Sequence, residues 1–147
     1  MARNGDDMSG EQMGFPHLVK WAEMAVRARV ERAMRDLPIS SSQLFALVLL
    51  DERGEATAAE LARLMHLTPQ ALTTLLKPLR DQGLIEREVD EAHRRRLNMR
   101  LTQAGRAVIE RARALTPDIE GAMLAGFSAK ERQTLLRLLA RVARPLD

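Results

Sequence analysis

The sequence contains no cysteine, and this absence excludes several kinds of chemistry at the outset. Without thiols the chain can form no disulfide bond, no thiolate metal site and no thiol-based redox sensor. Aromatic residues are also scarce, at 3% of the chain, with one tryptophan and no tyrosine. The hydrophobic core must therefore consist mainly of leucine, alanine, valine and methionine. A composition so rich in good helix formers favours a mostly α-helical fold.

Long apolar segments are missing as well. The longest uninterrupted apolar run covers residues 44–50, which is far too short to span a bilayer. Residues 1–14 contain acidic side chains and no apolar stretch, so they do not resemble a secretory signal. We therefore expect a soluble, cytoplasmic protein without membrane contact, whose first 14 residues form a flexible tail.

The sequence also lacks a recognisable catalytic or metal-binding pattern. His17, His66 and His93 are spread over three predicted elements and show no spacing typical of metal ligands. No nucleophile with a nearby base, and no pair of carboxylates, is placed as an active site would require. We accordingly expect neither an enzyme nor a protein with a metal or other cofactor.

The outer parts of the chain predict helices. With 147 residues, the chain suits one domain, or one domain plus a dimerisation extension. Apolar residues at helical spacing predict a first helix over residues 16–36 and a last helix over residues 129–144. A long helix runs from Thr102 to about residue 126, and Pro117 predicts a kink or a break in it. The first and last helices carry apolar faces broader than one contact requires, which favours a homodimer.

The central part of the chain predicts a helix-turn-helix. Thr57 and Glu60 form a capping box for a short helix over residues 58–65. Thr68 begins the next helix, which should end at Gly83. Only a tight turn separates the two helices, and this spacing is typical of a helix-turn-helix.

Beyond this motif the pattern changes to that of a β-hairpin. Residues 84–89 and 97–101 alternate between the two faces of a strand. Arg94, Arg95 and Arg96 lie in the loop between them. A guanidinium suits phosphates and the narrow minor groove of A·T-rich DNA, so this loop is a candidate DNA ligand. The alternative is an ordinary charged turn, in which neighbouring acidic residues offset part of the positive charge.

The second helix of the motif has two different faces. At about 100° per residue its leucines share one side, which we expect to pack onto the preceding helix. The opposite side carries Gln70, Thr73, Thr74, Lys77 and Asp81. Glutamine and threonine side chains can hydrogen-bond to base edges and phosphates. A polar face that contacts only solvent is the alternative, and the basic hairpin beside the helix favours DNA.

From about Pro38 to Leu139 the sequence resembles the MarR family of winged-helix regulators. The matching residues, in chain order, are Ile39-Ser40, Gln43, Leu47, Leu50, Gly54, Thr57, Glu60-Leu61-Ala62, Leu67-Thr68, Leu72-Thr73, Leu79, Gly83-Leu84-Ile85, Arg87, Arg95, Leu101-Thr102 and Gly105. The resemblance implies a winged helix-turn-helix with a terminal-helix dimerisation region. It implies an obligate homodimer that binds successive major grooves of a pseudo-palindromic operator in double-stranded DNA. It also implies repression of a nearby gene, relieved by a small phenolic or anionic ligand.

Carried over residue by residue, the family's recognition helix corresponds to residues 69–82. Its candidate DNA contacts are Thr68, as N-cap and phosphate ligand, and Gln70, Thr73, Thr74 and Lys77. The family's wing arginine corresponds to Arg95, with Arg94 and Arg96 beside it. The resemblance thus assigns residues 37–102 to DNA binding and residues 15–36 and 103–147 to dimerisation.

Three residues depart from the family's pattern. His93 stands two residues before Arg95, where the family usually has an aspartate, and Thr74 replaces a common basic residue. Pro78 lies in the middle of the recognition helix, where it removes a backbone donor. These departures leave a second interpretation open, a winged-helix protein-interaction module with weakened or non-specific DNA binding. Discrimination between DNA sequences would distinguish the two.

The family's ligand pocket lies between the dimerisation helices and the winged helix. His17, Trp21 and Met24 lie on one face of the first helix, with Arg27 close to it, so these four residues are candidate effector ligands. Trp21 has a second interpretation, as a residue of the dimer core.

Overall fold

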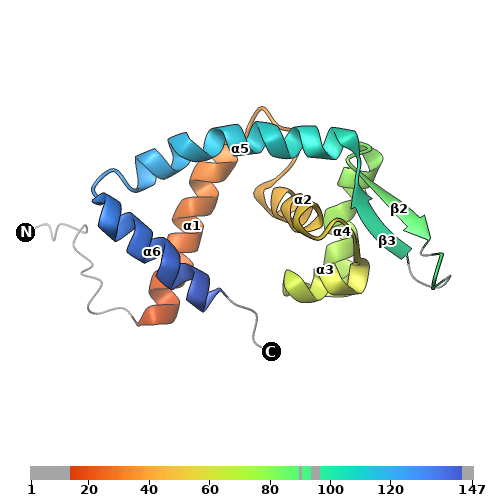
Figure 1. Cartoon of the computed structure of the whole chain (residues 1–147), viewed down its shortest axis with the longest axis horizontal. Coiled ribbons are helices and arrows are strands. Elements are labelled where there is room, and N and C mark those ends of the chain that lie inside the picture. Colours follow the sequence, from red (N-terminus) through yellow and green to blue (C-terminus); the bar gives the residue numbers. More distant parts are fainter. Residues whose placement is uncertain (1–13, 90, 94–96, 144–147) are drawn as a thin grey trace, which may run out of the picture.

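The computed structural model describes residues 14–89, 91–93 and 97–143. Its elements are α1 (Phe15–Ala33), α2 (Ser41–Arg53), β1 (Ala56–Thr57), α3 (Ala58–Leu64), α4 (Pro69–Asp81), β2 (Ile85–Val89), β3 (Leu97–Leu101), α5 (Gln103–Met123) and α6 (Ala129–Val142). Helix α5 runs along the length of the molecule, with α1 and α6 near one end and α2, α3, α4 and the hairpin near the other (Figure 1). The predicted fold class, mostly helical with a small β-hairpin, is confirmed.

Local side-chain hydrogen bonds explain where the helices begin. Capping boxes start three helices, at Ser40 with Gln43, Thr57 with Glu60 and Ser128 with Glu131. In the second box, the Thr57 hydroxyl accepts from the Glu60 amide at 3.2 Å, and the Glu60 carboxylate accepts from the Thr57 amide at 2.7 Å. Each box satisfies amide groups that a helix start leaves without partners, a contribution of about 1 kcal/mol per cap. These boundaries are therefore encoded locally.

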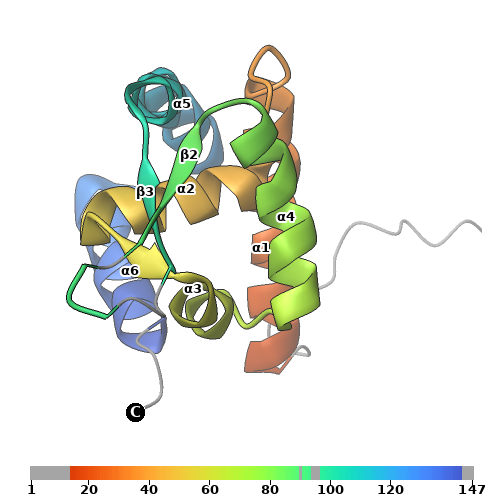
Figure 2. The same ribbon diagram turned by 90° about the vertical axis from the view of Figure 1, so that its right-hand side faces the viewer.

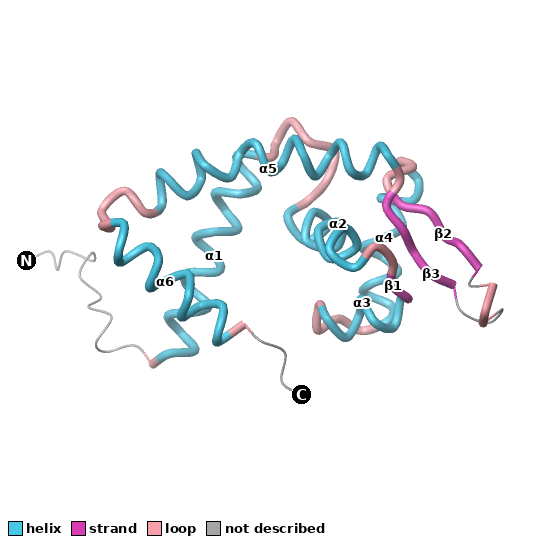
Figure 3. Tube along the Cα trace, viewed as in Figure 1, coloured by secondary structure: helices cyan, strands magenta, loops and turns pink. Residues whose placement is uncertain are grey.

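The sheet has three antiparallel strands in the order β1-β3-β2 (Figure 3). The hairpin register places Ile85 opposite Leu101 and Val89 opposite Leu97. Strand β1 was not predicted from the sequence, because its two residues are too few to show an alternating pattern. It forms by pairing with β3, where Ala56 lies opposite Met99. This third strand ties the hairpin to the start of α3.

A single core lies between α2, α3, α4, the sheet and the first half of α5. Its largest fully buried side chains are Leu47, Leu50, Leu61, Leu72, Leu79, Met99 and Ile109. Among the described residues no polar or charged side chain is buried. Helices α1 and α6 have no buried residue, and large apolar side chains such as Trp21 (55% exposed) and Val142 (53% exposed) lie on their surfaces. The helix-turn-helix region thus has its own core, whereas the terminal helices do not.

The long helix α5 differs from the sequence prediction. A break at Pro117 was one of the two outcomes expected, and it is wrong, since α5 continues through Pro117 to Met123. A proline inside a helix removes one main-chain hydrogen bond, and the turns on either side retain theirs. In the described part of the chain, no helix combines the length and the apolar character needed to cross a membrane.

Candidate nucleic-acid interface

The turn between α3 and α4 fixes the position of α4. His66 adopts a left-handed backbone conformation with φ of 52°. The Leu67 amide donates to the Ala62 carbonyl at 2.9 Å, which closes the end of α3. Thr68 then caps α4, because its hydroxyl accepts from the Ala71 amide at 3.1 Å. The predicted helix-turn-helix is therefore present, and α4 and the β2–β3 hairpin belong to the same end of the molecule (Figure 2).

Helix α4 separates its apolar and polar side chains as the helical wheel indicated. Leu72, Leu76 and Leu79 are buried in the core. The opposite side is exposed and carries Gln70, Thr73, Thr74, Lys77 and Asp81. Pro69, Gln70, Thr73 and Thr74 line a shallow hollow at the start of the helix. The structure thus brings the candidate contacts of α4 onto one accessible face, and their role as DNA contacts stays a prediction.

Several polar groups on this face already have partners. The Thr73 hydroxyl donates to the Pro69 carbonyl at 2.9 Å, and the Thr74 hydroxyl donates to the Gln70 carbonyl at 3.1 Å. The Lys77 ammonium lies 2.7 Å from the Asp81 carboxylate. Both charged side chains are exposed, so this ion pair adds little to stability. It does, however, place a negative charge beside the cation that would approach DNA.

The hairpin contains the predicted wing, but Arg94, Arg95 and Arg96 lie outside the described residues. Arg100, in β3, lies close to these arginines in the sequence, and the structure gives it two carboxylate partners. Its guanidinium lies 2.8 Å from the carboxylates of both Glu55 and Glu88. The hydrogen bond to Glu55, followed by the charge of Glu88, raises the pKa of Arg100. This arginine therefore joins β3 to β2 and to the segment before β1, and its charge is already balanced.

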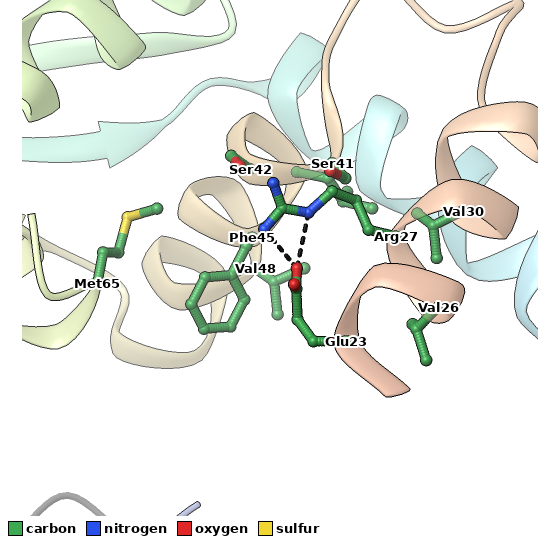
Figure 4. Close-up of a pocket in the computed structure, with 10 residues that line it drawn as sticks. Glu23, Val26, Arg27, Val30, Ser41, Ser42, Phe45, Val48 and Met65 are labelled. Carbon is green, nitrogen blue, oxygen red and sulfur yellow. Dashed lines mark hydrogen bonds and ion pairs between the residues drawn. The ribbon is translucent and has the colours of Figure 1, made fainter. Parts of the chain in front are cut away.

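A cavity of about 570 Å³ lies between α1 and α2 (Figure 4). Its lining consists of Val26, Val30, Leu44, Phe45, Val48 and Met65, of Ser41 and Ser42, and of Glu23 with Arg27. The Arg27 guanidinium donates to the Glu23 carboxylate at 2.7 Å. The hydrogen bond from Lys20, followed by that from Arg27, lowers the pKa of Glu23, so this carboxylate is ionised at neutral pH. The cavity therefore combines an apolar wall with one ion pair.

Of the four predicted effector residues, one lines this cavity and three do not. Arg27 lines it, whereas His17, Trp21 and Met24 are exposed and are not among the lining residues. Sequence reasoning missed the contribution of α2 and α3, above all Phe45, which is half-exposed beside the cavity. The sequence gives no signal for this position, because Phe45 lies within the uninterrupted apolar run of residues 44–50.

The described fold resembles known transcriptional regulators. Residues 36–96 match the profile of the MarR family. The HTH-type transcriptional repressor Rv2887 of Mycobacterium tuberculosis is 31% identical over 117 residues, which cover 80% of this chain and 84% of that protein.

Two solved structures are also similar. A mutant of MarR from E. coli complexed with operator DNA has a TM-score of 0.79 at 23% identity, and the match covers 93% of this chain and 99% of that one. BpsR of Bordetella bronchiseptica, whose DNA binding is regulated by 6-hydroxynicotinic acid, has a TM-score of 0.78 at 21% identity, and the match covers 97% of this chain and 100% of that one. At these identities, the two structures support the fold.

Proposed function

Because the chain belongs to the MarR family of transcriptional regulators, we propose that it binds a specific DNA operator as a homodimer and represses a nearby gene until a small ligand releases it. Family membership confirms that the chain is a regulator and not an enzyme. The observation that carries the proposal is helix α4. Its leucines fix it in the core while its exposed side carries the polar residues that base edges and phosphates require.

The homodimer is supported by the unburied apolar faces of α1 and α6. Phe15 and Met24 on α1 are 60% and 56% exposed, and Leu136 on α6 is 54% exposed. A second copy of the chain is the partner that covers such faces most simply. We therefore assign residues 15–36 and 103–147 to dimerisation and residues 37–102 to DNA binding. Two copies of α4 would then occupy major grooves about one helical turn apart, at a pseudo-palindromic site.

The DNA contacts we propose come from α4 and from the wing. Gln70, Thr73, Thr74 and Lys77 would face the major groove, with Thr68 near a phosphate at the start of the helix. Arg95, with Arg94 and Arg96 beside it, would bind phosphates or the minor groove, since a guanidinium suits both.

Fluorescence anisotropy over a salt series tests DNA binding. The duplex comes from just upstream of the protein's own gene, and a scrambled duplex of equal length is the comparison. We expect strong preference for the native duplex and a steep decrease of affinity with salt. Arg95→Ala should weaken binding and lower the salt slope by about two units, because each subunit of the dimer loses one phosphate contact. Arg35→Ala, which removes an exposed charge from the α1–α2 loop, should leave the slope unchanged. Equal affinity for both duplexes would contradict sequence-specific repression.

We propose that the ligand is a phenolic or anionic small molecule in the cavity between α1 and α2. A volume of about 570 Å³ lies within the range of small-molecule pockets. The carboxylate or phenolate of an aromatic ligand would compete with Glu23 for Arg27, while its ring contacts Phe45 and Val48. Since α1 belongs to the proposed dimerisation region and α2 to the DNA-binding region, a ligand between them would alter the spacing of the two α4 helices.

Titration of the preformed complex with 6-hydroxynicotinic acid, benzoate and phenol tests this part of the proposal. At least one of these probes should weaken DNA binding by about ten-fold, which is within the usual range of allosteric coupling. Arg27→Ala should abolish that response without changing the affinity for DNA in the absence of ligand. Arg29→Ala is the matched control, because Arg29 is exposed on the same helix and does not line the cavity. Release of DNA by none of the probes, or equal release from the Arg27 variant, would contradict the site.

A further inference from the structure

Two neighbouring threonines on the exposed face of α4 have their hydroxyl protons directed back into the helix. Thr73 donates to the Pro69 carbonyl at 2.9 Å, and Thr74 donates to the Gln70 carbonyl at 3.1 Å. Each hydroxyl oxygen retains lone pairs that can accept a hydrogen bond from outside the helix. A hydroxyl that already donates is also a stronger acceptor, since hydrogen bonds in a chain polarise one another. The threonine pair therefore presents acceptors, and no spare donor, to a base edge.

The two charged residues farther along the same face also favour hydrogen-bond donors, rather than acceptors, on the base edge. Lysine contacts guanine through its O6 and N7 acceptors, but the Lys77 ammonium lies 2.7 Å from the Asp81 carboxylate. Asp81 itself is an acceptor, of the kind that pairs with the amino group of cytosine. The exposed face of α4 is thus rich in acceptors, and its own lysine is partly neutralised.

We propose that Thr73 and Thr74 determine operator specificity by accepting hydrogen bonds from exocyclic amino groups, N6 of adenine or N4 of cytosine, in the major groove. This inference rests on the sequence-specific DNA binding proposed above. The major-groove edges of guanine and thymine present carbonyl oxygens at the equivalent positions. Opposite them, a threonine oxygen would face another lone pair unless its hydroxyl gave up the bond within the helix. Loss of that bond costs about five-fold in affinity, the equivalent of about 1 kcal/mol.

The threonine methyl group offers a different way of recognising a base, because it can contact the methyl group of thymine. Two kinds of substitution separate these possibilities. Thr73→Val and Thr74→Val keep the branched shape and a methyl group but remove the hydroxyl. Thr73→Ser and Thr74→Ser keep the hydroxyl but remove the methyl group. Both positions are exposed in the helix, and melting curves check that each variant folds as the wild type does.

Selection of bound duplexes from a random pool, followed by sequencing, measures the base preference at every position and does not require that the operator be identified first. For the wild type we expect a two-fold symmetric motif in which each position next to Thr73 and Thr74 has one defined base pair, with its adenine or cytosine on the strand that faces the threonine. Each valine variant should reduce the preference at one such position by about five-fold, and each serine variant should keep it. Replacing that adenine with a purine nucleoside that lacks the N6 amino group should then weaken the wild type about five-fold and leave the valine variant unaffected.

Four results would overturn the inference. Serine variants that lose the preference while valine variants keep it would show recognition through the methyl group. Unchanged wild-type affinity for the duplex in which the adenine lacks its N6 amino group would show that the hydroxyl does not accept from that group. A wild-type motif that none of the four substitutions changes would remove both threonines from base recognition, while sequence-specific binding itself would stand. Absence of any enriched motif for the wild type would overturn both the inference and the proposed function.

Discussion

Gly105→Ala is expected to lower the free energy of unfolding by about 3 kcal/mol, because no space exists for a methyl group at this position. Gly105 is buried in the first turn of α5. A Cβ atom there would lie 2.1 Å from the Leu84 carbonyl oxygen and 3.1 Å from the Leu101 side chain. The nearest atom belongs to the backbone, so it cannot move aside as the end of a flexible side chain would. Either α5 or the start of β2 must shift.

Hydrogen bonds around the same turn make that shift costly. The Thr102 hydroxyl donates to the Gly83 carbonyl at 2.6 Å and accepts from the Gly105 amide at 3.1 Å. The Thr102 amide donates to the Leu84 carbonyl at 3.1 Å. One threonine thus joins the start of α5 to the segment between α4 and β2. Displacement of α5 would break these bonds and move the hairpin relative to α4.

Urea denaturation at a fixed protein concentration measures the effect, since the stability of a dimer depends on concentration. Gly121→Ala is the matched control in the same helix. Gly121 is exposed and nothing lies within 4 Å of a Cβ placed there, so alanine should stabilise the helix by about 0.5–1 kcal/mol. The two substitutions are chemically identical and are expected to have effects of opposite sign. An unfolding midpoint for Gly105→Ala equal to that of the wild type would contradict the close approach of α5 to Leu84.

The helices could be predicted from the sequence because their starts are encoded within four residues. The capping boxes at Thr57 and Ser128 need only the residue three positions later, and the structure contains both. Strand β1 could not be predicted in this way. Its partner β3 is about forty residues away in the sequence, and a two-residue strand has no pattern of its own. Local chemistry is visible in the sequence, whereas pairing across the fold is not.

In the candidate site, too, the features set by local sequence could be predicted, whereas those set by contacts between distant segments could not. The exposed face of α4 could be predicted because the period of a helix alone separates Thr73 and Lys77 from the buried leucines. The ion pairs of Arg100 could not be predicted, since its two carboxylate partners come from other segments. The cavity was located only through Arg27, because a helical pattern does not say which part of α1 faces α2. Prediction failed wherever two elements distant in sequence had to be placed against each other.

Pro78→Ala is expected to raise the free energy of unfolding by about 1–3 kcal/mol. Helix α4 continues past Pro78 to Asp81, although proline has no amide hydrogen to donate to the Thr74 carbonyl. Packing and hydrogen bonding stabilise the helix on both sides of this missing hydrogen bond. Leu76 and Leu79 are buried, and the Gln82 amide donates to the Pro78 carbonyl at 3.0 Å. Alanine would supply the missing donor and remove the crowding of the proline ring.

Urea denaturation of Pro78→Ala tests this expectation against Pro69→Ala in the same helix. Pro69 occupies the first turn of α4, where a missing amide hydrogen has no helical partner to lose, so its replacement should not stabilise the protein. Unchanged stability of Pro78→Ala would show that the end of α4 has already adjusted to the proline.

The effect of Pro78→Ala on DNA recognition follows from its place in the helix. Thr73 and Thr74 bond to carbonyls one turn before them, at Pro69 and Gln70, so their hydroxyl geometry does not depend on residue 78. Base preference at the threonine positions should therefore persist in the variant while stability increases. A changed preference would mean that Pro78 sets the orientation of the whole helix in the groove. Stability and specificity would then depend on the same residue, and the proline would be retained for DNA recognition at the expense of the helix.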